Sequence, residues 1–221
     1  MPDAELSSPE SLDVPEAAVL VRKRPKPGER RVQILQALAM MLEQPGSERI
    51  TTAALAARLD VSEAALYRHF ASKAQMFEGL IEFIEQSVFT LINQIQEREP
   101  VEGDQPADTG LKQAAKIVAM LVQFAEKNPG MTRVMVGDAL VFENERLQQR
   151  MNLFFDKIES TLKQSLRSGP AADGSAMPGA DAQVRSSMLT AFVAGRLQRF
   201  ARSGFRRLPS EHLEASLAKM L

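Results

Sequence analysis

The sequence predicts an all-α fold, because apolar residues recur at helical spacing in nearly every segment and no stretch has the alternation of a strand. Proline and glycine separate these segments, as at 45–46 and 128–130. With 221 residues, the chain suits one mostly helical subunit, or a small domain joined to a larger one. We predict a tail with a basic arm at 1–26, a small domain at 27–76 and a helical C-terminal domain at 77–221.

The first segments predict a tail followed by one helix. Residues 1–21 mix proline, serine and acidic residues without periodicity, which is typical of disorder. The cationic arm at 22–26 either touches DNA or is plain solvated surface. A helix over 29–44 is then indicated by the apolar stripe of Ile34, Leu35, Leu38, Met41 and Leu42, and Pro45-Gly46 ends it.

Residues 50–77 predict two short helices of about eight residues, joined by a tight turn and followed by a third helix. Thr51, Ser62 and Ser72 are each placed to cap one of the three. Ile50 and Leu55 fit a hydrophobic staple around the first cap. This spacing is that of a helix-turn-helix motif.

The second of these helices has a face suited to DNA. Leu66 and Phe70 lie on its inner side, whereas Ala64, Tyr67 and Arg68 point outward at about 100° per residue. A small alanine admits a base edge, an arginine reaches a guanine or a phosphate, and polar side chains and helix-start amides bind phosphates. The alternative is a helical hairpin with a solvated surface. We predict DNA contacts by Thr51, Thr52, Ser62, Ala64, Tyr67, Arg68, His69 and Lys73.

The rest of the chain predicts a helical body. One long helix runs from about Lys73 to Glu97, and the composition of 101–110 favours a loop. A second long helix ends at Asn128-Pro129-Gly130. Further elements are predicted at about 131–140, 144–167, 181–202 and 210–221, with a loop over 168–181 that is rich in glycine, alanine and proline.

Charge and composition narrow the function. Residues 22–80 hold ten lysines and arginines against six acidic residues, so the rest of the chain carries a net charge of −5, which we interpret as a basic head on an acidic body. Cysteine is absent, and the two histidines have no helical partner that would make a metal site. Without a phosphate loop or nucleophile motif, we expect no enzyme and no cofactor. No apolar run is long enough to span a membrane and the N-terminus does not resemble a signal peptide, so we expect a cytoplasmic protein on or near DNA.

The stretch LDVSEAALYRHFASKAQMF resembles the DNA-binding domain of TetR-type regulators. Matching residues are Val61, Ser62, Leu66, Tyr67, His69, Phe70, Ser72 and Lys73, while Asp60 replaces the usual turn glycine. The resemblance implies a homodimer on double-stranded DNA, with a pseudo-palindromic site whose half-sites are about 34 Å apart. The two subunits of this homodimer would pack through the helices at 181–202 and 210–221, or through those at 144–167 and 181–202. The apolar residues with the required spacing are Leu189, Phe192, Val193, Leu197 and Phe200.

Many TetR-type proteins are repressors that a small molecule releases from DNA. For such a ligand cavity the candidate residues are Met120, Met131, Met135, Met151 and Phe155, which fit a plain core equally well. A third alternative, a helical scaffold without DNA, predicts no salt-sensitive DNA binding.

A narrower group, the nucleoid occlusion factors, is also similar to this chain. The similarity covers about Arg31 to Arg167 and the last two helices, and its specific parts are LIEFIE and NPGMTR. It implies a DNA-bound dimer that inhibits assembly of the division protein FtsZ over the nucleoid. Leu91 stands where that group has a basic residue. The residues implied for the FtsZ contact are Phe83, Glu85, Met120, Lys127 and Asn128.

Overall fold

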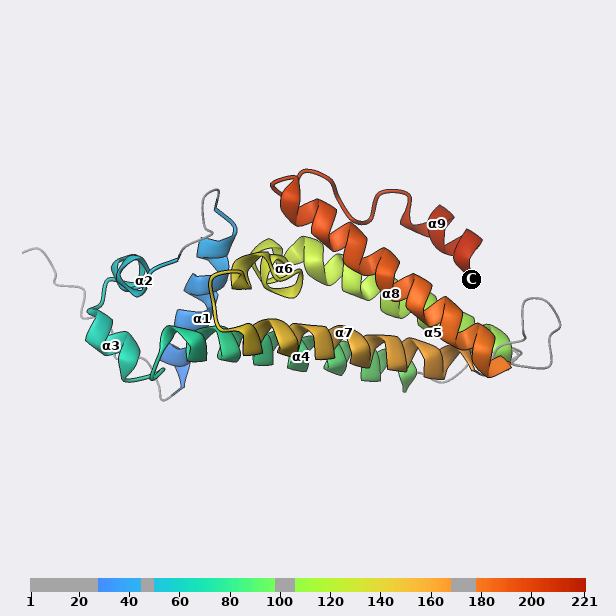
Figure 1. Cartoon of the computed structure of the whole chain (residues 1–221), viewed down its shortest axis with the longest axis horizontal. Helices are drawn as coiled ribbons and strands as arrows, with labels where there is room; N and C mark the ends of the chain where they lie inside the picture. The colour runs from blue at the N-terminus through green and yellow to red at the C-terminus, as the bar shows by residue number, and fades with distance from the viewer. Residues whose placement is uncertain (1–27, 45–49, 98–105, 168–177) are drawn as a thin grey trace, which may run out of the picture.

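The computed structural model describes residues 28–44, 50–97, 106–167 and 178–221, and every regular element within these ranges is helical. Figure 1 shows a small head at one end of an elongated body. The head contains α1 (Glu29–Leu42), α2 (Thr52–Leu59) and α3 (Glu63–Tyr67). The body contains α4 (Lys73–Gln96), α5 (Pro106–Lys127), α6 (Pro129–Met135), the short 3₁₀ helix η2 (Asp138–Leu140), α7 (Glu145–Leu166), α8 (Pro178–Arg202) and α9 (Leu213–Met220).

The head is a three-helix unit built on the start of α4. Its core is formed by apolar side chains from each helix, among them Ile34, Leu38, Leu55, Leu66 and Phe70, all almost fully buried. The stripe predicted for the first helix therefore packs on the hairpin, and α1 ends at Leu42, two residues before the predicted end. The predicted three-helix arrangement of the head is confirmed.

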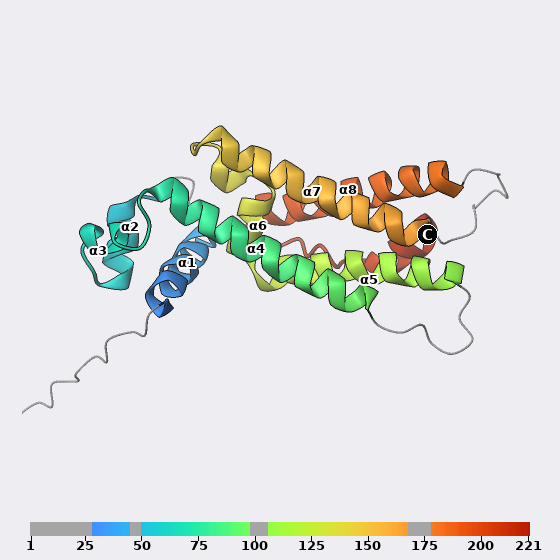
Figure 2. The same ribbon diagram turned by 90° about the horizontal axis from the view of Figure 1, so that it is seen from below.

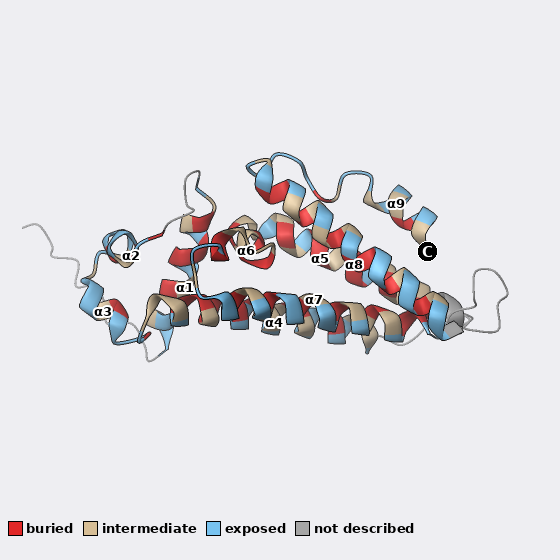
Figure 3. Ribbon diagram, viewed as in Figure 1, coloured by how far each residue is buried: buried red, intermediate tan, exposed pale blue. Residues whose placement is uncertain are grey.

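The body is a bundle of four long helices. In Figures 1 and 2, α4 leaves the head and runs beside α5 and α7, and α8 covers the other side of α7. Figure 3 shows the buried residues on the faces that these helices turn toward one another. None of the described helices is long and apolar enough to cross a membrane.

Head and body meet where α6 crosses α1. Gly130 makes this crossing possible, because a Cβ added there would lie 1.9 Å from the backbone oxygen of Ala39. On the next turn of α6, Arg133 donates a hydrogen bond of 3.3 Å to the carbonyl of Leu42, at the end of α1. The NPGMTR segment is therefore the joint between the two parts of the molecule.

Three predicted boundaries were wrong. The predicted loops 101–110 and 168–181 both end early, because α5 begins at Pro106 and α8 at Pro178. Proline is favourable at the first helical position, where no backbone N–H is needed, so it starts a helix as well as stopping one. The last helix is shorter than the predicted 210–221 and begins at Leu213. The predicted tail and basic arm (1–26) lie outside the described residues.

Candidate nucleic-acid interface

Three side-chain caps fix the helix-turn-helix, as predicted. The hydroxyl of Thr51 accepts a hydrogen bond from the Ala54 amide at 3.1 Å. Ser62 accepts one from the Ala65 amide at 3.3 Å, and Ser72 one from the Gln75 amide at 3.2 Å. Each cap satisfies an amide that the first turn of a helix leaves unpaired, so the three helix starts are set by local sequence.

The turn between α2 and α3 depends on a left-handed residue. Asp60 has φ 53° and ψ 51°, the conformation that glycine supplies in the usual TetR-type turn. Its amide donates to the carbonyl of Ala57 at 3.1 Å, and the amide of Val61 donates to Ala56 at 3.0 Å. Aspartate tolerates this conformation better than most residues, so replacing the glycine leaves the turn intact.

The outer face of α3 is exposed as predicted. Leu66 and Phe70 are buried, while Ala64, Arg68 and His69 are exposed and Tyr67 keeps 45% of its surface accessible. This helix is shorter than the predicted eight residues: it spans Glu63–Tyr67, Arg68 is its C-cap, and His69 lies in the following turn.

Arg31 of α1 holds this turn, a role that the sequence did not indicate. Its Nη1 donates to the backbone oxygen of His69 at 2.9 Å, and its guanidinium lies 4.1 Å from the centroid of the Phe70 ring. The contact joins residues 38 positions apart, so no local pattern predicts it. The end of α3 is therefore fixed by α1 rather than by its own sequence.

The hydroxyl groups predicted to bind phosphates at the start of the hairpin differ in their hydrogen bonds. The capping oxygens of Thr51 and Ser62 act as acceptors, so their hydroxyl protons are still available to a phosphate. The hydroxyl of Thr52 instead donates to the carboxylate of Glu63 at 2.5 Å. A phosphate contact by Thr52 therefore requires its backbone amide, or a hydroxyl released from Glu63.

Lys73 forms an ion pair with a residue of the body. Its ammonium is 2.5 Å from a carboxylate oxygen of Glu143, which precedes α7, and 5.7 Å from the centroid of the Phe77 ring. A phosphate contact by Lys73 requires this ion pair to exchange its carboxylate for a phosphate oxygen. The pair adds a second link between the head and the body.

The predicted acidic body was wrong. Residues 1–21 contain five acidic and no basic residues, so they carry the whole charge of −5 outside the head. Residues 81–221 contain 17 basic and 17 acidic residues and are neutral overall. The head is therefore the basic part of a chain whose acidic part is the N-terminal tail.

The residues implied for a protein partner do not all share one face of α4. Phe83 is exposed over 46% of its surface, whereas Glu85 turns to α7 and pairs with Arg150 at 2.6 Å. Residues two positions apart in an α-helix are separated by about 200° around its axis, so these side chains point in different directions. Arg150 also reaches the backbone oxygen of Glu78 at 3.5 Å, and its hydrogen bond to Glu85 raises the pKa of its guanidinium, against the opposing effect of burial.

The remaining partner candidates lie along α5. Met120 is half-buried in the middle of the helix, and Lys127 is exposed at its C-terminus. Asn128 links α5 to α6, and its side-chain Nδ2 donates to the carbonyl of Phe124 at 2.8 Å. Leu91, the departure from the nucleoid occlusion pattern, is exposed over 37% of its surface.

Most of the residues expected in the dimer seam belong to the subunit's own core. Leu189, Val193, Leu197 and Phe200 are almost fully buried within the single chain, and only Phe192 is partly exposed. The assignment of these four residues to the seam was wrong, because helical spacing identifies an apolar face without identifying what covers it, whereas the two predicted helix pairs stay predictions. Among the large apolar side chains described on α7 and α8, Leu153, Val184 and Met188 are more than half exposed.

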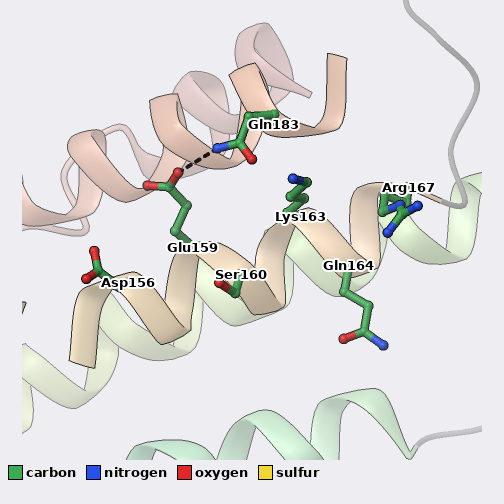
Figure 4. A pocket seen from close by; sticks show the side chains of 7 residues that line it. All are labelled: Asp156, Glu159, Ser160, Lys163, Gln164, Arg167 and Gln183. Atoms are coloured by element: carbon green, nitrogen blue, oxygen red, sulfur yellow. Dashed lines mark hydrogen bonds between the residues drawn. The ribbon is translucent and has the colours of Figure 1, made fainter. Parts of the chain in front are cut away.

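Two hollows beside α7 differ in character. Met135, Met151 and Phe155 from the predicted ligand cavity line a partly open groove of about 610 Å³, whose other wall is α8. Met120 and Met131 instead pack on the core. Figure 4 shows the second hollow, about 520 Å³, where Gln183 of α8 donates to the carboxylate of Glu159 at 2.9 Å. The polar lining of this second hollow does not suit a drug-sized apolar ligand.

Comparisons with known proteins agree with this architecture. Residues 34–80 match the family model of bacterial regulatory proteins of the tetR family, and residues 108–220 match the model of a tetracyclin repressor-like C-terminal domain of the SlmA-like type. The chain is 49% identical to nucleoid occlusion factor SlmA of Idiomarina loihiensis over 84% of its length and 90% of the relative's. It is 50% identical to the protein of the same name from Aliivibrio fischeri, over 85% and 92% of the two chains.

A solved structure shares the fold at low sequence identity. The transcriptional regulator FadR from Bacillus subtilis, in complex with stearoyl-CoA, superimposes with a TM-score of 0.66 over 86% of this chain and 96% of that one. At 14% identity this likeness shows the fold alone.

Proposed function

The chain belongs to the nucleoid occlusion factor SlmA family of TetR-type DNA-binding proteins, and from that membership we propose that it binds specific chromosomal sites as a homodimer and there inhibits FtsZ ring assembly. The observation that carries the proposal is similarity over most of the chain, including the body, together with an exposed recognition helix. The protein acts in the cytoplasm, on the nucleoid, as a regulator rather than as an enzyme.

In this proposal α3 enters the major groove. Ala64 allows close approach, Arg68 contacts a guanine edge or a phosphate, and Tyr67 and His69 contact the backbone. Thr51, Thr52 and Ser62 bind phosphates through hydroxyl protons and helix-start amides. Lys73 joins them when a phosphate replaces Glu143. The exposure of the α3 face and the caps that orient it support these roles.

Dimerisation uses the outer faces of α7 and α8. Leu153, Val184 and Met188 are more than half exposed, and Gly195 on α8 has an open surface where a partner helix can approach closely. Burying such side chains between two subunits gives the hydrophobic contribution that an obligate interface needs. The two-fold axis of this dimer must run along the length of the body, so that both heads face one side of the molecule, as a pseudo-palindromic site requires.

We assign the FtsZ contact to α4 and α5. Phe83 is an exposed aromatic anchor, and Lys127 is an exposed cation that attracts an acidic segment. Met120 lies on α5, as Lys127 does, and Asn128 directly follows that helix. Glu85 contributes through its ion pair with Arg150, which holds α4 against α7. With Leu91 in place of a basic residue, we expect this contact to depend more on apolar burial than on charge.

The test is FtsZ polymer assembly followed by light scattering, with the protein added alone and with its DNA site. We expect DNA-stimulated inhibition that is lost in Phe83→Ala. Phe142→Ala is a matched control, because Phe142 is also an exposed phenylalanine but precedes α7 on another part of the body. Equal assembly with and without the DNA site would contradict the division role. Release of DNA by a small molecule would instead favour a ligand-responsive repressor.

A further inference from the structure

Four exposed arginines gather where α8 ends. Arg199 and Arg202 occupy its last turn, and Arg206 and Arg207 follow in the next turn of the chain. We call these four residues the arginine turn. None of their guanidiniums has an acidic partner in the part of the chain that the structure describes, and no acidic residue occurs in 195–210.

The neighbouring Arg196, in contrast, has a structural role within the subunit. Arg196 donates to the backbone oxygens of Pro209 at 3.0 Å and Glu211 at 2.5 Å, and its guanidinium lies 4.4 Å from the Phe192 ring centroid. The guanidinium of Arg196 is therefore occupied by contacts within its own subunit. The arginine turn makes one side-chain hydrogen bond, from Nε of Arg206 to the Ser203 backbone oxygen at 2.9 Å, and all four residues are exposed in the single subunit. Arg206 and Arg207, which lie beyond α8 and its proposed dimer face, are therefore the pair most open to a ligand.

The backbone that carries these arginines is a built turn. Gly204 and Phe205 both have φ of 63°, an unfavourable conformation for phenylalanine. The Phe205 ring packs on Phe200 with 5.2 Å between centroids, which holds the strained residue in place. The hydroxyl of Ser203 accepts hydrogen bonds from the amides of Arg206 at 3.1 Å and Arg207 at 2.9 Å. The turn is therefore preorganised before any ligand arrives.

The chemistry of the arginine turn selects an oxyanion. It contains guanidinium groups only, whose planar forks match phosphate geometry better than an ammonium does. Arg199 and Arg202 also complement the dipole of α8, but Arg206 and Arg207 lie beyond the helix and are not explained by it. Since residues 81–221 are neutral overall, the turn is a local concentration of positive charge on the body.

The location of the turn separates it from the helix-turn-helix. Figure 1 shows that α8 ends at the end of the body nearer the head, beside α6, and away from α3. We propose that the arginine turn binds the phosphodiester backbone of duplex DNA, as a second contact separate from the helix-turn-helix. The phosphates come either from DNA flanking the recognised site or from a second duplex brought beside it.

The test compares Arg206→Gln/Arg207→Gln with Arg167→Gln/Lys219→Gln, a control that removes the same charge from exposed positions at the C-cap of α7 and on α9. The DNA probe is a duplex selected by repeated binding to the wild-type protein, used short and with long flanks. Each phosphate contact contributes about 0.9 to the slope of log K against log salt, so the test variant should lose roughly 1–2 units of slope. If the slope falls only on the duplex with long flanks, the turn binds DNA that flanks the recognised site. If protein already bound to its site no longer captures a second duplex, the turn binds that second duplex.

Several outcomes would overturn the proposal. One is equal slopes and equal capture for the wild type and both double variants, all with wild-type melting temperatures. Another is unchanged DNA binding with lost binding to phosphatidylglycerol vesicles, which would reassign the turn to a membrane surface. A wild-type protein that binds no duplex at all would contradict the proposed function itself, and is thereby distinguished from failure of this second site.

Discussion

Substituting Gly130 by alanine tests the joint between head and body. The new Cβ would lie 1.9 Å from the Ala39 oxygen and 2.9 Å from the Ala39 carbonyl carbon, and both are backbone atoms that cannot move alone. α6 must therefore shift away from α1. Overpacking of this kind costs about 1–3 kcal/mol, and the cost rises if Arg133 also loses the Leu42 carbonyl. For a chain of this size that predicts a melting temperature lower by roughly 2–12 °C.

The assay is thermal unfolding followed by circular dichroism at fixed protein concentration, with Gly179→Ala as the control. Gly179 lies at the start of α8, and a Cβ there meets nothing within 4 Å, so the control should not melt earlier than the wild type. Gly130→Ala with an unchanged melting temperature would refute the reasoning, because it would mean that α6 and α1 are not in tight contact. A normal melt for the control and an early melt for Gly130→Ala would confirm it.

Three further predictions concern the caps, the seam and the brace. Ser62→Ala removes the cap of α3 and should cost about 1 kcal/mol in stability by denaturant unfolding, with weaker site binding by fluorescence anisotropy; unchanged values for both would contradict the cap's role. Met188→Glu should convert the dimer to a monomer in sedimentation, whereas Leu208→Glu, equally exposed elsewhere, should remain dimeric; a dimeric Met188→Glu would place the seam on another face. Glu85→Ala leaves Arg150 without its carboxylate and should cost roughly 1–3 kcal/mol by denaturant unfolding, and a neutral result would show that water replaces the pair.

Local signals in the sequence predicted the helix-turn-helix well. The hydroxyls of Thr51, Ser62 and Ser72 each accept a hydrogen bond from the amide three residues later, so their capping roles can be predicted without knowing the fold. The inward Leu66 and outward Tyr67 follow from helical periodicity in the same way. Pro106 and Pro178 were misread for a related reason, since one residue type both ends and begins helices.

Contacts between distant segments could not be predicted. The pair of Lys73 and Glu143 joins positions 70 residues apart, and that of Glu85 and Arg150 joins positions 65 apart. Helical spacing also cannot tell a subunit's own core from a dimer seam, which is why Leu189 was assigned to the wrong surface. Such features depend on how whole helices pack, and no local pattern encodes them.

Mapping the bound sites across the chromosome tests the central claim most directly. A nucleoid occlusion factor should occupy many sites scattered over the chromosome and sparse near the replication terminus, and Arg68→Ala should weaken that pattern. Occupancy at one promoter beside a regulated operon, or no enrichment over input DNA, would contradict the account.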